Sequence, residues 1–166
     1  MNDDLVCLFA YNRWADRRVL DACHKLSPEQ YAAEPVPGWS SVRASVVHIT
    51  SATQNWIRRL AGEEVSTALT EADLPTLEEA ERRLHQAYQI LDGLWPALTP
   101  ERLATPQTFQ VRGQSWVLPP WVVMRHIVNH ATYHRGQVAS KLKRFGVQQP
   151  ETDLVFWAVE HVPQPK

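Results

Sequence analysis

The sequence predicts an all-α protein: one domain over residues 1–166 in which four long helices form a bundle, with a small hairpin or loop before the last long helix. Two observations predict this fold class. Apolar residues recur every three or four positions through four long stretches, which is the periodicity of an amphipathic helix. Proline, glycine and capping residues separate these stretches. The chain is long enough to bury a core without disulfide or metal staples, so a metal ion here would serve function.

The first half of the chain contains two of the long helices. Residues 3–26 carry apolar side chains at helical spacing, and Ser27-Pro28-Glu29-Gln30 has the form of a capping box that begins a short helical turn. A loop with two prolines and a glycine follows. We expect Ser40 to cap the second long helix, over residues 41–61, and Gly62 to end it.

The second half contains the other two long helices. A capping box precedes the first, over residues 77–95. Between residues 105 and 118 apolar and polar residues alternate on either side of Arg112-Gly113, which predicts a small hairpin or looped lid. Two prolines open the last helix, over residues 120–145. The apolar patch at residues 154–157 is expected to pack back on the bundle.

Composition and charge exclude several classes of protein. The formal net charge is −1 and both signs are intermixed, so we expect binding neither to nucleic acid nor to an anionic membrane. Cys7 and Cys23 lie in one predicted helix, too far apart for a disulfide, which indicates reduced thiols. The chain begins with acidic residues where a signal peptide carries basic ones, and it has no apolar run of membrane-spanning length. A cytoplasmic protein is predicted.

Two histidines of the last predicted helix face its buried side. On a helical wheel with Ile127 at zero, His134 falls at about −20° and His130 at about −60°, whereas His126 falls at about −100°, on the flank. Imidazoles four residues apart on one helix face can bind one metal ion, as in H-x-x-x-H zinc motifs. The alternative is a pair of polar histidines that are hydrogen-bonded inside a core.

A third ligand has to come from elsewhere in the chain. The candidates by residue type are the carboxylates and four further histidines: His24, His48, His85 and His161. Small residues, Ala44 and Ala52, lie on the side of the second long helix that carries His48, and they leave room for an ion. The residues alone leave this choice open.

Four segments spread over nearly the whole chain carry a family resemblance: YNRWADRRVLDA (11–22), SVRASVVHI (41–49), ADLPTLEE (72–79) and VNHATYHRGQV (128–138). They resemble the DinB family, damage-inducible bacterial proteins grouped with YfiT-like metalloenzymes. The resemblance implies a four-helix bundle of the DinB/YfiT type in which His48, His130 and His134 bind one divalent ion. It also implies a homodimer. Some relatives are transferases or isomerases that use small thiols such as mycothiol or bacillithiol.

Four further residues are candidates for the same site. His126 is expected at its rim, because its wheel position points away from the buried stripe. Asn12 can reach the site from the first helix or make a buried structural hydrogen bond. Arg135 and Arg43 can hold an anionic substrate group, although helix arginines are solvated by default.

Two functions are consistent with these residues. Three neutral ligands leave coordination positions open to water or substrate, as in catalytic sites, and this predicts a metal-dependent transferase or hydrolase acting on a small thiol or another small molecule. Zinc suits imidazole ligands, and nickel, iron, manganese or cobalt are the alternatives. The second function is a non-catalytic, dimeric metal-binding protein of a stress or damage response. With unperturbed imidazoles, metal affinity is expected to fall below about pH 6.

Overall fold

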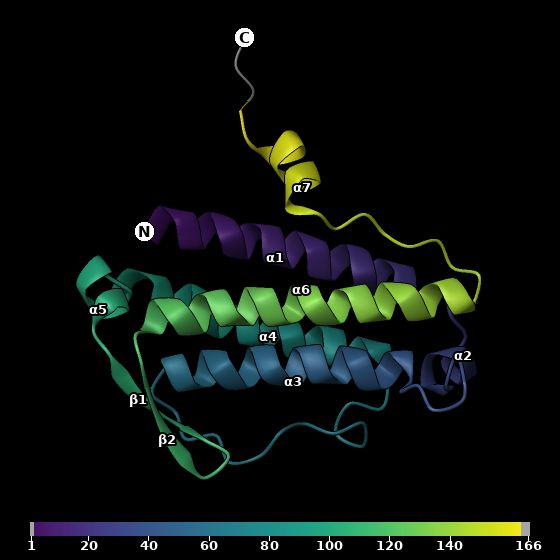
Figure 1. Cartoon of the computed structure of the whole chain (residues 1–166), viewed down its shortest axis with the longest axis horizontal. Coiled ribbons are helices and arrows are strands. Elements are labelled where there is room, and N and C mark those ends of the chain that lie inside the picture. Colours follow the sequence, from purple (N-terminus) through teal and green to yellow (C-terminus); the bar gives the residue numbers. More distant parts are fainter. Residues whose placement is uncertain (1, 164–166) are drawn as a thin grey trace.

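The computed structural model describes residues 2–163, and most of them are helical (Figure 1). The elements follow in the order α1 (Asn2–Cys23), α2 (Pro28–Ala32), α3 (Val42–Leu60), α4 (Leu77–Leu94), the 3-10 helix η1 (Trp95–Ala97), α5 (Pro100–Ala104), β1 (Gln107–Val111), β2 (Gln114–Leu118), α6 (Pro120–Arg144) and α7 (Leu154–His161). The prediction of a largely helical fold is confirmed. No helix within residues 2–163 has the length and apolar character needed to cross a membrane.

Capping residues set the helix starts largely as predicted. Ser27 Oγ accepts a hydrogen bond from the Gln30 amide at 3.2 Å, and Gln30 Oε1 accepts one from the Ser27 amide at 3.0 Å. This capping box is therefore confirmed, as is the one before α4. The prediction that Ser40 caps α3 was wrong. Ser41 is the cap, because its extended backbone places Oγ 2.8 Å from the free amide of Ala44.

The four long helices α1, α3, α4 and α6 lie side by side (Figure 1). α3 contacts both α4 and α6, and α1 contacts α6 along its length. The connection between α3 and α4 runs back along α3, where Ser51 Oγ accepts from the Leu69 amide at 2.8 Å and Asn55 donates to the Thr67 carbonyl at 3.2 Å. This return brings α4 parallel to α3, while α6 runs antiparallel to α3.

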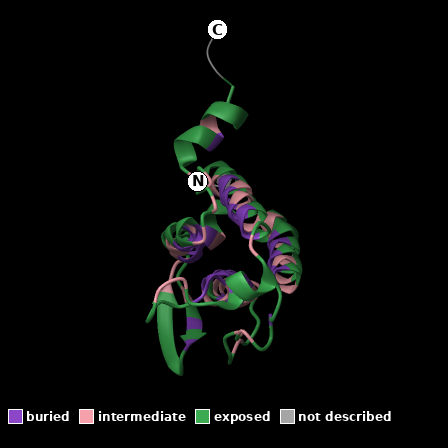
Figure 2. Cartoon of the chain, turned by 90° about the vertical axis from the view of Figure 1, so that its right-hand side faces the viewer, coloured by how far each residue is buried: buried purple, intermediate pink, exposed green. Residues whose placement is uncertain are grey.

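Buried residues lie where the long helices pack together, and exposed residues cover the outer sides (Figure 2). Most of the buried residues are apolar. The largest fully buried apolar residues come from every long helix, from the α3–α4 connection and from the segments that join α4 to α6: Leu5, Phe9, Ile57, Leu60, Leu74, Leu91, Leu98, Leu103, Met124, Ile127 and Leu142. Burial of a side chain of this size contributes about 1.5–3 kcal/mol. This core holds α3 and α6 in fixed register.

The predicted hairpin is confirmed. β1 and β2 pair antiparallel, with Phe109 opposite Trp116, and the turn between them places Arg112 and Gly113 at φ values of 52° and 75°. A two-residue type I′ turn requires positive φ at both of its central residues. Glycine adopts positive φ without steric cost, which explains Gly113.

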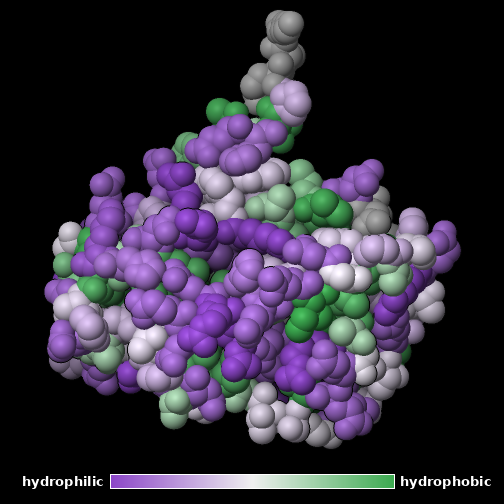
Figure 3. Space-filling view, turned by 180° about the vertical axis from the view of Figure 1, so that it is seen from behind, coloured by the Kyte–Doolittle hydropathy of each residue, from purple (hydrophilic) through white to green (hydrophobic). Residues whose placement is uncertain are grey.

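The last helix, α7, packs on α1 through one residue of the predicted apolar patch. Trp157 is buried near Tyr11, whose hydroxyl donates to the Thr152 carbonyl at 2.9 Å. The other patch residues, Leu154, Val155 and Phe156, remain exposed. The expectation that the patch packs on the bundle is therefore met by Trp157 alone. From behind, the surface is mainly hydrophilic, and hydrophobic residues show where α7 meets the bundle (Figure 3).

Candidate metal centre

Three histidines converge at the edge of the contact between α3 and α6. One nitrogen of His48, from α3, and one each of His130 and His134, from α6, all lie within 4.8 Å of one another. His48 is exposed and the other two are half-buried. The structure therefore brings together the three residues that the family resemblance implied.

The arrangement follows from helix geometry. His130 and His134 are one turn apart on α6, beside the buried residues Ile127 and Ala131, so they lie where the core meets the surface. Because α3 runs alongside α6 in the opposite direction, His48 comes opposite this pair. The rings are close packed, with centroid distances of 5.0 Å from His48 to His130 and 4.4 Å from His134 to each of the others.

The donor set fits a divalent ion. The Nε2 atoms of His48 and His130 are 3.2 Å apart. Two nitrogens bound to a tetrahedral zinc ion, each about 2.0–2.1 Å from the metal, lie about 3.3–3.4 Å apart. His134 Nδ1 is 2.8 Å from Gln137 Oε1, an acceptor that keeps the proton on Nδ1 and leaves Nε2 free for a metal. Three imidazole nitrogens suit zinc, nickel, iron or cobalt.

His48 and His130 are poised in the neutral form that a metal requires. Burial, together with repulsion from the neighbouring imidazoles, lowers the pKa of His130 to about 4. Burial and the charges of His134 and Arg112 lower the pKa of His48. A lowered histidine pKa means that protons compete with a metal only in more acidic solution.

This shift changes the expected pH dependence. With unperturbed pKa values, protons would displace the ion below about pH 6; with the pKa of His130 at about 4, we expect zinc to be retained at pH 6 and released as the pH approaches 4. In the metal-free protein, the unfolded chain binds protons at higher pH than folded His130 does, so stability falls as the pH drops from about 6.5 towards 4. Zinc titrations at pH 7, 6 and 5 test the first statement, and a tenfold loss of affinity between pH 7 and 6 would contradict it.

His126 lies at the rim of the site, as predicted. Its ring centroid is 5.4 Å from that of His130 and 5.5 Å from that of Trp56, and it is outside the group of converging nitrogens. Burial lowers its pKa, so it is neutral at pH 7. It can accept a proton next to the cluster.

Asn12 and Arg135 belong to one buried hydrogen-bond network, so of the two alternatives for Asn12 the structure shows the buried structural hydrogen bond. Arg135 is 2% exposed, and its Nη1 donates to Asn12 Oδ1 at 2.6 Å and to Asp16 Oδ1 at 2.7 Å. The Tyr88 hydroxyl donates to the second carboxylate oxygen of Asp16 at 2.5 Å and accepts from Asn12 Nδ2 at 2.8 Å. The expectation of a solvated or substrate-binding Arg135 was wrong, because the guanidinium is buried and paired with Asp16. Arg43 is paired with Glu71 at 2.6 Å.

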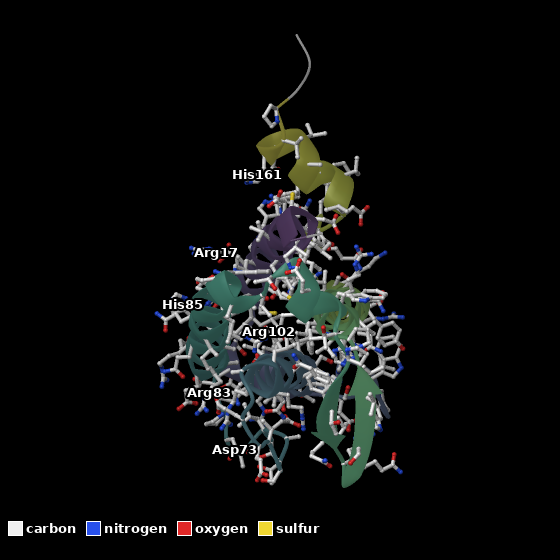
Figure 4. The ribbon with its side chains drawn as sticks, turned by 90° about the vertical axis from the view of Figure 1, so that its left-hand side faces the viewer. Arg17, Asp73, Arg83, His85, Arg102 and His161 are labelled. Carbon is white, nitrogen blue, oxygen red and sulfur yellow. The ribbon has the colours of Figure 1, made fainter. Side chains whose placement is uncertain are left out.

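The remaining histidines and the cysteines lie away from the cluster. His24 pairs with Glu81 at 2.8 Å, and Figure 4 shows His85 on α4 and His161 on α7, apart from each other. Cys7 and Cys23 are both free, as expected. Burial raises the pKa of Cys23 to about 12, so this thiol is not a ready metal ligand.

Comparison with known proteins identifies the family of the chain. A model of the DinB family matches residues 1–164. The chain belongs to the DinB family. Protein DinB of Bacillus subtilis (strain 168) is 27% identical to it, over 92% of this chain and 92% of that protein. The resemblance seen in the four sequence segments is thereby confirmed.

Proposed function

We propose that this DinB-family protein binds one divalent ion at His48, His130 and His134 and uses it as a metal-dependent transferase or hydrolase. Zinc is the first candidate, and nickel, iron, manganese and cobalt follow. The observation that carries the proposal is the open side of the cluster: His48 is exposed, and only three of the residues that the structure describes converge. We further propose that the four long helices form the DinB/YfiT-type bundle and that the protein acts in the cytoplasm.

An ion bound there would act as a Lewis acid and would favour the deprotonated form of a thiol or water molecule. The chain's own groups hold the ligands and receive protons. Gln137 fixes the ring orientation of His134, and the ring of Tyr133 lies 5.0 Å from it. Neutral His126, next to His130, is placed to take up the proton that a thiol or water loses. A small thiol is the substrate that best fits these roles.

Turnover with defined substrates tests the proposal. The protein is loaded in turn with zinc, nickel, iron, manganese and cobalt and assayed with small thiols plus electrophilic acceptors and with ester and amide substrates. We expect activity with at least one metal, loss on chelation, and a reduction of about 10²–10⁴-fold in His126→Ala if that residue carries the proton. Inactivity with every metal and substrate would contradict an enzyme.

A second function is favoured by one observation. Within residues 2–163 no carboxylate joins the three converging histidines, so proton transfer there would depend on a group such as His126. A non-catalytic, dimeric metal-binding protein of a stress or damage response needs no such group. The same turnover assay separates the two proposals.

We also propose a homodimer formed through α7. The exposed apolar residues of this helix, Leu154, Val155, Phe156 and Val159, lie close together in sequence beside the buried Trp157. Light scattering at micromolar concentration is expected to give about twice the chain mass of 19.0 kDa. Val159→Asp should reduce the mass to one chain, whereas Val117→Asp, an equally exposed position on β2, should not. A wild-type mass of one chain would refute the dimer.

A further inference from the structure

A pocket opens on α6 next to the histidine cluster. It has a volume of about 400 Å³, within the range of small-molecule sites. It lies between α6 and the loop that precedes α3. The lining residues that matter for the argument are Trp39, Ser40, Tyr133, Gly136, Gln137 and Lys141. Gln137 belongs both to this pocket and to the metal centre, because its Oε1 contacts His134 Nδ1.

The pocket contains a buried positive charge. Lys141 is 5% exposed, and its Nζ donates to Ser40 Oγ at 2.8 Å, to the Ser41 carbonyl at 3.2 Å and to Ser45 Oγ at 2.5 Å. All three acceptors are neutral. No carboxylate of residues 2–163 forms an ion pair with Lys141, and the nearby Glu71 is paired with Arg43. A buried cation without a counter-ion favours binding of an anion.

Hydrogen-bond donors are available in the same pocket. Because Ser40 Oγ accepts from Lys141, its own hydroxyl proton is free to donate to a ligand. The Oε1 atom of Gln137 is engaged with His134, which leaves the amide NH₂ to donate. Among the residues that the structure describes, none of those lining the pocket is acidic. These donors match a negatively charged group that accepts hydrogen bonds.

Gly136 keeps one side of the pocket open. A glycine inside a helix costs about 1 kcal/mol relative to alanine. A Cβ at Gly136 would meet no atom within 4 Å, so packing within the chain does not require glycine here. A larger side chain at this position would project into the pocket that Gly136 lines.

Two aromatic rings line the pocket. Trp39 and Tyr133 are both exposed, and the Arg144 guanidinium lies 5.8 Å from the Trp39 ring. Exposed aromatic rings beside a buried cation suit a ligand with an apolar body and one anionic end.

We propose that this pocket binds a small carboxylic acid, with the carboxylate at Ser40 and Gln137 near Lys141 and the apolar body against Trp39 and Tyr133. This proposal rests on the proposed function. The carboxylate would belong to the small molecule that reacts at the metal centre, and Gln137, which would hold it, lies one helical turn from His134. Binding of a carboxylic acid requires no turnover, so the proposed pocket and the proposed enzyme can fail separately. The single positive charge of Lys141 is balanced by a singly charged carboxylate, whereas a doubly charged phosphate would leave one negative charge without a partner.

Calorimetric titration of the zinc-loaded protein tests this, with benzoate as probe, benzyl alcohol as neutral control and phenyl phosphate as dianionic control. We expect one benzoate site that persists after chelation of the zinc, with both controls binding at least about tenfold more weakly. Lys141→Met should weaken benzoate by about tenfold or more. Gly136→Leu should abolish binding, while Gly93→Leu, at a helical glycine of α4 that is equally free of neighbours, should not change it.

Several results would overturn the proposal. If benzoate binding were unchanged in both Lys141→Met and Gly136→Leu, benzoate would bind outside this pocket. If chelation of the zinc abolished benzoate binding, benzoate would bind to the metal. Tighter binding of phenyl phosphate would assign the pocket to a dianion. A lower mass of Gly136→Leu in light scattering would identify the surface as a contact between two copies of the chain. Benzoate binding without any enzymatic turnover would support the pocket while contradicting the proposed enzyme.

Discussion

His130→Ala or His134→Ala is expected to abolish tight binding of a divalent ion, with a loss of affinity above about 100-fold. Each variant removes one of three converging nitrogens, and loss of a group that merely orients a ligand already costs about 10–100-fold. Gln137→Ala, which removes the acceptor for His134 Nδ1, should therefore fall in that lower range. Zinc titration against a competing chelator gives the affinities.

His126→Ala is the matched control for these variants. It removes an imidazole from the same helix, one turn from His130, that does not converge with the other three. Its affinity and stoichiometry should stay near those of the parent. Loss of the ion in His126→Ala, with retention in the other two variants, would overturn the assignment of the ligands.

Asp16→Ala is expected to lower the free energy of unfolding by about 3–5 kcal/mol. The Asp16 carboxylate is 5% exposed and receives hydrogen bonds from Arg135 and Tyr88, so its removal leaves a guanidinium buried without its counter-ion. Urea unfolding followed by circular dichroism measures the effect.

Asp92→Ala provides the comparison. Asp92 also pairs with an arginine between α1 and α4, Arg13, but both side chains are substantially exposed. A loss of no more than about 1 kcal/mol is expected there, since solvent screens such pairs. If Asp16→Ala and Asp92→Ala lowered the free energy of unfolding equally, burial would not explain the contribution of the Asp16–Arg135 pair to stability.

The sequence predicted the helices well because each carries its own boundary signals. The capping boxes at Ser27 and Thr76 and the glycine of the hairpin turn are local features, and the structure uses all of them. The cap of α3 was misplaced by one residue because Ser40 and Ser41 are both suitable, and only the backbone conformation decides between them.

The site was partly predictable for the same reason. His130 and His134 share one helix, so a helical wheel places them on one face. His48 lies on another helix, and spacing along the chain cannot give the register of α3 against α6; the family resemblance supplied it. The burial of Arg135 was missed because it depends on partners from α1. A signal was present in hindsight: Asn12 and Asp16 are two polar residues one turn apart on the same face of that helix.

The pocket beside the metal centre had no signal in the sequence. Lys141 reads as an ordinary basic residue near a helix C-terminus, where lysine is favourable. Its burial arises from the loop before α3, which places Ser40 and Ser41 over the ammonium group. A contact between segments that are distant in the sequence leaves no periodic pattern of residues from which it could be predicted.

X-ray absorption at the zinc edge of the zinc-loaded protein tests the central claim, that three imidazoles hold one ion and leave the rest of its coordination open. We predict three imidazole nitrogens at about 2.0–2.1 Å together with one or two oxygen ligands, and a change in the oxygen shell when a small thiol is added. A fourth imidazole, or a sulfur ligand at about 2.3 Å before any thiol is added, would contradict the account, because the protein would then close the site itself.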